Sequence, residues 1–287
     1  MRILIIGGTG TIGSYVVRRL LAERAPLRVL TTSIERAKYL PHGVDPFIGN
    51  LERPDTYFEA FKGVTHVFMV NQQSENEIGQ SLFAIELAKE AAVAKFVYLS
   101  IHKAHAGDTV SHFKPKIMTE YALRGSGMNY VFICPGNFYQ NDLCFKTALN
   151  KDKMYDQPLG NIGLSRVDLR DVAEAVSVVI YTSRFDRQRI VLAGPDVWTG
   201  ERTASQLSKQ LNMDITYTGD DLKSFKNKYY LYHPRWIVDE WSATYNFYQK
   251  NGSIASLEEE HLLRKVLDRE PICYEQFLTD YRHQLTR

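Results

Sequence analysis

Short apolar runs alternate with amphipathic stretches along the first half of the chain. The apolar runs predict buried strands over Arg2–Ile6, Leu27–Thr31, Val44–Ile48, Val64–Val70, Phe96–Ser100 and Tyr130–Cys134. Helical spacing between them predicts helices over Thr11–Arg24, Pro54–Phe61, Glu77–Ala92 and Pro115–Gly125. Strands separated by helices of this length form βαβ units with right-handed crossovers. The predicted fold class is therefore α/β, with a doubly wound parallel sheet.

The pattern after Pro135 is less regular and predicts a smaller lobe. The further predicted elements are helices over Asp168–Tyr181, Thr203–Leu211 and Tyr274–Leu285 and a late strand over Arg189–Ala193. Nine aromatic residues fall within Phe225–Tyr248, where Pro234 suits the first position of a second helix. We predict a sheet domain over residues 1–134 and a C-terminal lobe over 135–287, with 165–195 returning to the sheet domain.

Composition narrows the class of protein. The 287 residues are 44% hydrophobic and 24% charged, which is typical of a globular chain, and the net charge of +2 gives no footprint for nucleic acid. No apolar run approaches the length of a membrane span, and the N-terminal run is too short for a signal peptide. We therefore expect a soluble cytoplasmic protein without a membrane or nucleic-acid partner. The cysteines are too few and too scattered for a disulfide framework: Cys134, Cys144 and Cys273.

A glycine-rich loop, Gly7–Gly13, lies between the first strand and the first helix. Glycines allow a tight turn and a close approach of the backbone to a pyrophosphate, and the helix N-terminus supplies free N–H groups. At this position the motif predicts a dinucleotide site. The expected contacts are Gly7, Thr9, Gly10, Thr11, Ile12 and Gly13.

The end of the second strand bears on the choice between NADP and NAD. An NAD site usually has an acidic residue there, but this chain has Thr31, Thr32 and Ser33. Glu35 is assigned instead to a capping box with Thr32, which opens a short helix to Leu40. We predict that Thr32, Ser33 and Arg36 contact a 2′-phosphate, so NADP is preferred and NAD remains possible. The alternative is that Arg36 is an ordinary surface charge.

Further motifs resemble those of a known family. The loop GGTGTIG is similar to that of extended short-chain dehydrogenases, and Asn50 stands where their "GDL" element has Asp. The other matching segments are Ala60–Phe68, Phe96–Ser100, His112–Lys116 with Glu120, Pro135–Asn141 and Val167–Ala173. Their order and spacing resemble the NmrA-like family of atypical short-chain dehydrogenases, well over residues 2–195 and loosely beyond.

The resemblance implies a Rossmann domain that binds NAD(P), and a substrate lobe. It adds these expected cofactor contacts: Asn50, Leu51, Val70, Asn71, Lys116, Pro135, Asn137 and Phe138. Phe138, Tyr139 and Asn141 follow the sixth strand at the carboxyl edge of the sheet, where ligands bind in open α/β folds. We expect these three to line the substrate site, with Phe138 beside the nicotinamide. The alternative for Phe138 is a core aromatic.

Three residues are candidates for catalysis. Ordinary short-chain dehydrogenases pair a Tyr with a Lys four residues later; here Lys116 is kept but His112 replaces the Tyr, and Ser100 ends the fifth strand. A cation at Lys116 disfavours a charged imidazole, so His112 should donate a hydrogen bond and act as a poor acid. Pro115 adds a difficulty, because a helix that starts only there leaves His112 outside it.

Other chemistries fit the sequence less well. His102, His105 and His112 match no zinc spacing, so we expect no metal, and the chain has no G-x-S-x-G element of a serine hydrolase. The main hypothesis is an NADPH-dependent oxidoreductase that reduces a quinone-like or flat carbonyl acceptor. The alternative is a non-catalytic NAD(P) sensor whose cofactor state controls binding to a regulatory protein.

Overall fold

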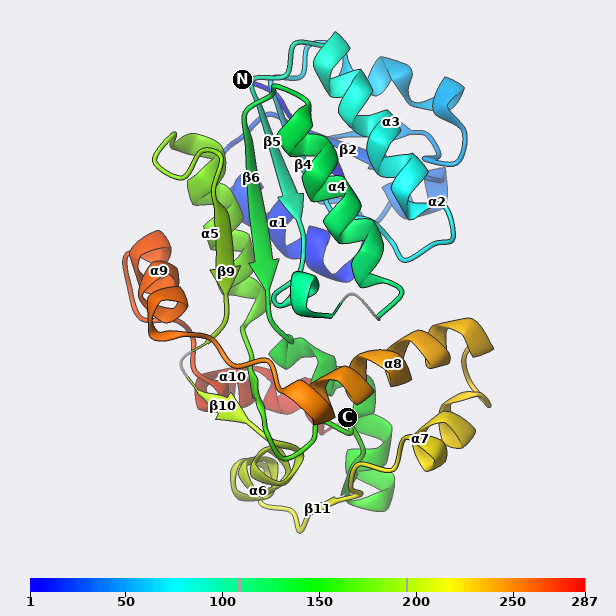
Figure 1. The fold of residues 1–287 in the computed structure, drawn as a ribbon, viewed down its shortest axis with the longest axis vertical. Helices are drawn as coiled ribbons and strands as arrows, with labels where there is room; N and C mark the ends of the chain where they lie inside the picture. The colour runs from blue at the N-terminus through cyan, green and yellow to red at the C-terminus, as the bar shows by residue number, and fades with distance from the viewer. Residues whose placement is uncertain (108–109, 195, 287) are drawn as a thin grey trace. The chain divides into compact units, whose positions relative to one another are not determined.

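The structure, a computed structural model, describes residues 1–107, 110–194 and 196–286 (Figure 1). Two compact units make up the chain. The sheet unit consists of Met1–Ala104, Lys114–Cys134 and Leu169–Ile190, and the second unit consists of His105–Phe113, Pro135–Asp168 and Val191–Arg287. Each unit is therefore assembled from three separate stretches of sequence.

A parallel sheet is the centre of the sheet unit. Within the described residues, seven strands follow the order β3-β2-β1-β4-β5-β6-β9. Their bounds are β1 Ile3–Ile6, β2 Leu27–Thr31, β3 Val44–Ile48, β4 His66–Met69, β5 Lys95–Leu99, β6 Tyr130–Pro135 and β9 Arg189–Leu192. The five registered pairs from β3 to β6 are all parallel. The order reverses at β1, so the predicted doubly wound sheet is confirmed.

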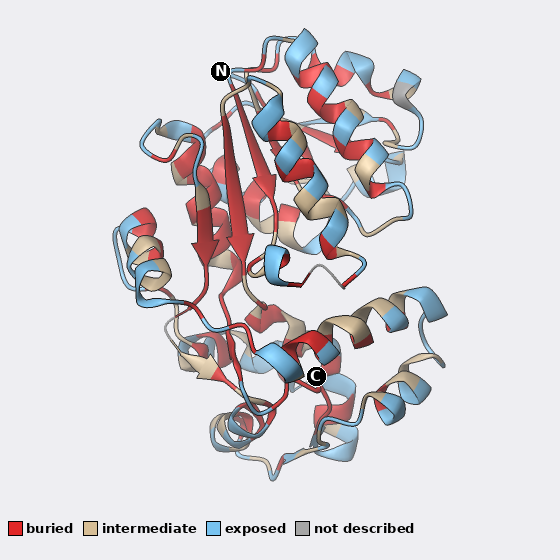
Figure 2. Ribbon diagram, viewed as in Figure 1, coloured by how far each residue is buried: buried red, intermediate tan, exposed pale blue. Residues whose placement is uncertain are grey.

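Helices cover both faces of the sheet, which explains why the central strands are continuous apolar runs. All four residues of β1 are buried. The strands β5 and β6 are buried along their whole length as well, and they are drawn red in Figure 2. The apolar stripe of α1 (Thr11–Ala22) packs against α5 (Leu169–Tyr181), while α3 (Glu77–Glu90) and α4 (Phe113–Gly125) cover the opposite face (Figure 1). Val16, Val17 and Leu20 supply the buried stripe of α1.

Two local predictions, a helix and a helix cap, need correction. The predicted helix over Pro54–Phe61 is two short 3₁₀ turns, η1 (Pro54–Thr56) and η2 (Phe58–Phe61). The cap of α2 (Ile34–Ala37) is Ser33 and not Thr32, because the Ser33 hydroxyl accepts from the Arg36 N–H at 3.3 Å. A Ser or Thr hydroxyl can fill this place, so two adjacent candidates left the choice open by one residue.

The start of α4 also differs from the prediction. The helix begins at Phe113, two residues before Pro115. Proline fits there because the first-turn N–H groups of a helix have no partner within the helix. His112 still lies outside the helix, which leaves it without a helical i,i+4 alignment with Lys116.

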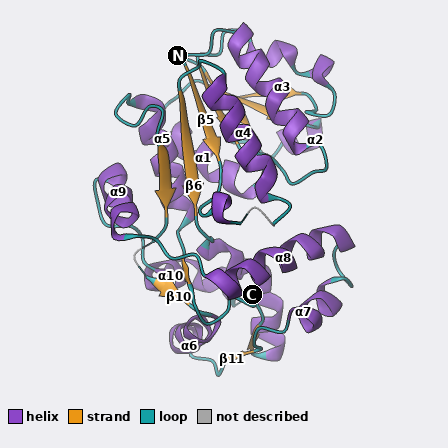
Figure 3. Cartoon of the chain, viewed as in Figure 1, coloured by secondary structure: helices purple, strands orange, loops and turns teal. Residues whose placement is uncertain are grey.

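The second unit is mostly helical, as Figure 3 shows. Its helices of eight or more residues are α6 Gly200–Leu211, α7 Leu222–Tyr229, α8 Arg235–Asn251, α9 Leu257–Leu267 and α10 Tyr274–Leu285. Pro234 lies at the N-cap of α8, directly before the predicted second aromatic helix. Sequence reasoning missed α9 and the short strands, namely β7 Met154–Tyr155, β8 Leu164–Ser165, β10 Val197–Trp198 and β11 Thr216–Tyr217. Further short turns are η3 Ala104–Ala106, η4 Tyr139–Phe145 and η5 Ala148–Asp152.

A buried ion pair organises the second unit. Arg166 and Asp142 are fully buried, and an Arg166 Nη2 lies 2.8 Å from an Asp142 carboxylate oxygen. Tyr155 and Tyr274 donate their hydroxyl hydrogens to the same carboxylate, at 2.9 Å and 2.5 Å. Removing one partner of such a pair would leave a buried charge uncompensated and would strongly destabilise the folded state.

Among the helices of the described residues, we find none that combines the length and the apolar character needed to cross a membrane.

Candidate functional site

Two glycines of the loop are required by the fold itself. Gly7 has a φ of +83°, and a Cβ there would lie 2.2 Å from the carbonyl oxygen of Val70. A Cβ on Gly13 would lie 2.2 Å from the carbonyl oxygen of Gly7. Because both obstacles are backbone atoms, neither position accepts a side chain without moving β1, β4 or the start of α1.

Gly10 differs from these two glycines. It is the N-cap of α1, and its N–H donates to the Gly7 carbonyl at 3.0 Å. A Cβ on Gly10 would meet only that carbonyl, at 3.3 Å, and its φ of −84° is open to any residue. Because Gly10 has no side chain, the space in front of the N-terminus of α1 stays open to a ligand. The free N–H groups of the first helical turn face this space and can bind an anion.

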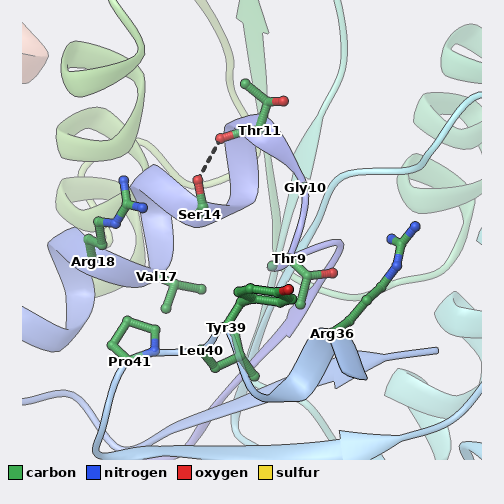
Figure 4. A pocket seen from close by; sticks show the side chains of 11 residues that line it. Thr9, Gly10, Thr11, Ser14, Val17, Arg18, Arg36, Tyr39, Leu40 and Pro41 are labelled. Carbon is green, nitrogen blue, oxygen red and sulfur yellow. Dashed lines mark hydrogen bonds between the residues drawn. The ribbon is translucent and has the colours of Figure 1, made fainter. Parts of the chain in front are cut away.

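A cavity of about 460 Å³ adjoins the loop (Figure 4). Two cations line it, Arg18 from α1 and Arg36 from α2, and Figure 4 shows Thr9 and Tyr39 between them. In the described part of the chain, neither guanidinium has an acidic group within ion-pair distance. The cavity thus presents two uncompensated positive charges near a helix N-terminus. The other lining residues are Gly8, Gly10, Thr11, Ser14, Val17, Leu40 and Pro41.

A second cavity of about 290 Å³ shares Thr9 and Arg36 with the first. It brings together seven residues expected from the sequence to contact the cofactor: Gly7, Thr9, Thr32, Arg36, Asn50, Leu51 and Val70. Sequence reasoning missed Glu52, Gln72, Ser74 and Gln80 of this cavity, and Arg18 and Tyr39 of the first. A signal for Arg18 existed, since it follows Ser14 by one turn on the same face of the first helix.

Ser33 and Glu35 both form hydrogen bonds at the N-terminus of α2. The Ser33 hydroxyl caps the helix, as described above. A backbone hydrogen bond and the Ser33 hydroxyl lower the pKa of the Glu35 carboxyl. Glu35 therefore belongs to the helix start, as the sequence predicted, although its capping partner is Ser33.

Lys116 is held by a buried carboxylate. Its Nζ lies 2.8 Å from Oε1 of Glu77, in the first turn of α3, and only 2% of the Glu77 side chain is exposed. The same ammonium lies 5.5 Å from the centre of the Tyr98 ring, on β5. Burial alone would lower the pKa of Lys116, but Tyr98 and Glu77 outweigh it and raise that pKa. Lys116 is thus a fixed cation at neutral pH.

Ser100 belongs to another buried cluster. Its hydroxyl donates to the carboxylate of Glu120, which is completely buried in α4. Arg189 approaches the same carboxylate oxygen at 3.2 Å and donates to the carbonyl of Ile101 at 2.5 Å. The candidate catalytic role of Ser100 stays a prediction, and the structure adds that its hydroxyl already donates a hydrogen bond to Glu120.

His112 lies in the second unit and has a carboxylate beside it. Its Nδ1 and its backbone N–H each lie 3.2 Å from Oε2 of Glu240, on α8. Its ring also packs edge-on against Phe113, at 4.8 Å between ring centres. Sequence reasoning missed Glu240, because 128 residues separate it from His112 and no local motif connects them.

Three of the remaining candidates in the second unit contact Arg166. Asn137 accepts from Arg166 through its side-chain oxygen at 3.0 Å, and Phe138 accepts through its carbonyl at 2.8 Å. Tyr139 is fully buried, and the Arg166 guanidinium carbon lies 5.6 Å from the centre of its ring. Its neighbour Asn141 donates its backbone N–H to the Phe138 carbonyl at 3.2 Å. Pro135 is buried at the end of β6.

The predicted site is therefore divided between the units. The glycine loop, both cavities, Asn71, Ser100 and Lys116 belong to the sheet unit. The second unit holds the other six candidates, which are His112, Pro135, Asn137, Phe138, Tyr139 and Asn141.

A parallel doubly wound sheet, with a glycine loop before α1 and cationic cavities beside it, defines the class of dinucleotide-binding α/β proteins. The chain belongs to the NmrA-like family, whose model matches residues 1–269. It is 30% identical to an NAD(P)H azoreductase of Xenophilus azovorans over 225 residues, which is 78% of this chain and 79% of that relative.

Solved structures share the whole fold. An NADPH-dependent quinone oxidoreductase of Escherichia coli, crystallised with NADPH, superposes with a TM-score of 0.86 and 22% identity, covering 98% of this chain and 99% of the other. NmrA, a negative transcriptional regulator crystallised with NADP, superposes with a TM-score of 0.79 and 18% identity, covering 96% and 93%. At these identities the likeness shows the fold alone.

Proposed function

We propose that the protein binds NADPH and reduces a flat acceptor such as a quinone or an azo compound. The observation that carries the cofactor is the open side of Gly10 in the first cavity, which shares Arg36 with the second. In this proposal the pyrophosphate lies against the N-terminus of α1. Arg36 and Arg18 would hold the 2′-phosphate, and Asn50 and Leu51 would contact the adenosine.

The residues fit this cofactor in charge as well as in shape. A 2′-phosphate adds about two negative charges, and the first cavity offers two arginines that have no carboxylate partner in the described chain. β2 ends at Thr31, so the strand end lacks the acidic residue that usually binds the 2′-hydroxyl of NAD. NADP is therefore the preferred cofactor, and NAD binds more weakly.

The reaction assigned to the chain is hydride transfer. When bound, NADPH supplies a hydride, and one proton from solvent completes the reduction of a quinone to a hydroquinone. Lys116 holds the nicotinamide ribose, with Val70 and Asn71 at the end of β4 beside it. His112 donates a hydrogen bond to the acceptor oxygen, and Phe138 flanks the nicotinamide. An activated phenol is absent from the position of His112, which favours acceptors whose reduced anion is stable without one.

The names of similar proteins support this choice. One relative is an NAD(P)H azoreductase, and one protein of the same fold is an NADPH-dependent quinone oxidoreductase. Quinones and azo compounds are both flat two-electron acceptors, so one site can accept either class.

The test is NADPH oxidation by the purified protein with a panel of quinones and azo dyes. Turnover with at least one acceptor, lost in Gly10→Leu, supports the proposal. No cofactor binding by the parent protein would contradict the whole proposal.

A second candidate function is a non-catalytic sensor, favoured by the NADP-bound transcriptional regulator of the same fold. Its signature in the same experiment is tight NADPH binding without turnover of any acceptor. That result would replace the reductase by the sensor and direct the search to a partner protein.

A further inference from the structure

The environment of Lys116 contains a carboxylate that no motif of the sequence indicated. Glu77 begins α3, and its side chain is 2% exposed, while the side chain of Lys116 is 12% exposed. A buried carboxylate and a buried ammonium 2.8 Å apart each compensate the charge of the other. Taking one charge away would leave the other buried without a partner.

The same turn of α3 also reaches a second candidate contact of the cofactor. Asn71 donates through its side-chain amide to the Ser81 hydroxyl at 3.1 Å. Ser81 in turn donates to the backbone carbonyl of Glu77 at 3.0 Å. A continuous chain of polar contacts therefore runs from Asn71 after β4, through the first turn of α3, to Lys116 on α4.

We propose that Glu77 is a positioning residue, which holds the Lys116 ammonium charged and in place for the ribose of the cofactor. This inference rests on the proposed function, because the contact of Lys116 with the ribose is part of that proposal. Glu77 itself touches neither cofactor nor substrate. Its part is to keep three N–H donors and one positive charge at a fixed point of the carboxyl edge of the sheet.

The charge of Lys116 depends on few neighbours. The titratable groups that act on it are Glu77 from α3 and Tyr98 from β5, and burial opposes both. Burial in turn raises the pKa of the Tyr98 phenol, so Tyr98 stays neutral near pH 7. Glu77 is the carboxylate that lies 2.8 Å from the Lys116 ammonium, and without it less opposes the burial of Lys116, so the pKa of Lys116 falls.

This reasoning gives a pH signature for Glu77→Gln. In the parent protein the pKa of Lys116 is raised, so the ammonium persists and NADPH affinity is flat from pH 7 to 10. In Glu77→Gln the ammonium is lost as pH rises. We expect NADPH to bind a few-fold more weakly at pH 7 and at least tenfold more weakly at pH 10. The 2′-phosphate does not disturb this window, because its second pKa is near 6.

The chain contains a matched control. Lys95, on the same strand as Tyr98, is buried and forms an ion pair of 2.6 Å with the partly exposed Asp186. Lys95 lies at the opposite, amino end of β5. Asp186→Asn removes a carboxylate from a buried lysine in the same way, away from the carboxyl edge. It should lower stability and leave the pH profile of NADPH affinity flat.

The experiment measures NADPH dissociation constants by calorimetry from pH 7 to 10 for the parent, Glu77→Gln, Glu77→Asp and Asp186→Asn. Glu77→Asp keeps the negative charge and should restore most of the flat profile. A second readout needs no cofactor: the ¹³Cε resonance of Lys116, assigned with Lys116→Arg, should titrate at lower pH in Glu77→Gln than in the parent. If Glu77→Gln does not fold, Glu77→Asp replaces it in the comparison with the parent. Its NADPH affinity should then fall at pH 10 by less than the tenfold expected for Glu77→Gln.

The outcomes separate the two proposals. A flat affinity profile with an unshifted Lys116 resonance in folded Glu77→Gln would overturn the role of Glu77 and leave NADPH binding intact. If Asp186→Asn also lost NADPH affinity at high pH, the effect of Glu77→Gln would reflect general destabilisation. That result would also overturn the role of Glu77. Absence of NADPH binding in the parent would refute the proposed function, and with it the positioning role.

Discussion

At the scale of single residues, the glycines of the loop have different tasks. Gly7 and Gly13 leave out a side chain because backbone carbonyls occupy that space, whereas Gly10 leaves it out on the open side. The sequence predicted the loop and its ligand class from the glycine spacing and from the place of the loop between a strand and a helix. It could not assign these tasks, because the obstacles at Gly7 and Gly13 come from the fold, and the Val70 carbonyl lies 63 residues away.

Gly10→Ala should weaken NADPH binding without unfolding the protein. The methyl group enters the space of the pyrophosphate and obstructs charge-assisted contacts worth about 1.5–3 kcal/mol each, so the affinity should fall about 10- to 100-fold. The added Cβ meets one atom at 3.3 Å, and the backbone conformation suits alanine, so the unfolding free energy should change by less than about 1 kcal/mol. Calorimetric titration and thermal unfolding check both halves, and unchanged affinity would contradict the cofactor site.

Arg36 and Arg18 should contribute to the binding of NADPH but not to the binding of NADH. Arg36→Ala and Arg18→Ala should each weaken NADPH binding about tenfold or less, because both groups are exposed, and should leave NADH binding nearly unchanged. Arg19→Ala, on the neighbouring position of α1 but paired with Glu23, is the control. The measurement is the ratio of NADPH to NADH affinity at two salt concentrations, and a parent that prefers NADH would refute the assignment.

At the scale of elements, local pattern predicted most boundaries to within two residues. It failed where tertiary contacts decide: the segment over Pro54–Phe61 has an apolar helical pattern, yet it forms two 3₁₀ turns. The same limit applies to the site. The glycine loop is local in sequence and was found, while Glu77 beside Lys116 and Glu240 beside His112 come from distant elements and were not.

Gly13→Ala tests the packing of α1 on β1. A Cβ 2.2 Å from the Gly7 carbonyl forces the helix away from the strand, and overpacking of this kind costs about 1–3 kcal/mol or more. The melting temperature should fall by several degrees, at about 2–4 °C per kcal/mol. Gly10→Ala is the matched control in the same loop. Equal melting temperatures for the two variants would show that the close approach at Gly13 is unimportant.

At the scale of the whole molecule, ligand binding and stability are coupled. NADPH at about 100 times its dissociation constant should stabilise the folded state by about 2.7 kcal/mol, which is roughly 5–10 °C in melting temperature. NADH at the same concentration should give a smaller shift, because it lacks the 2′-phosphate. Differential scanning fluorimetry of the parent checks this order, and Arg36→Ala should bring the two shifts together. A larger shift with NADH would reverse the cofactor preference.

The packing of α1 on α5 has a consequence for the synthesis of the chain on the ribosome. The apolar stripe of α1 is made near the beginning, but its partner helix begins only at Leu169. At translation rates of 5–20 residues per second, the roughly 150 intervening residues take about 7–30 s. During that time α1 lacks the helix that packs against it in the finished protein. The nascent chain is therefore expected to need protection from aggregation until α5 has left the exit tunnel.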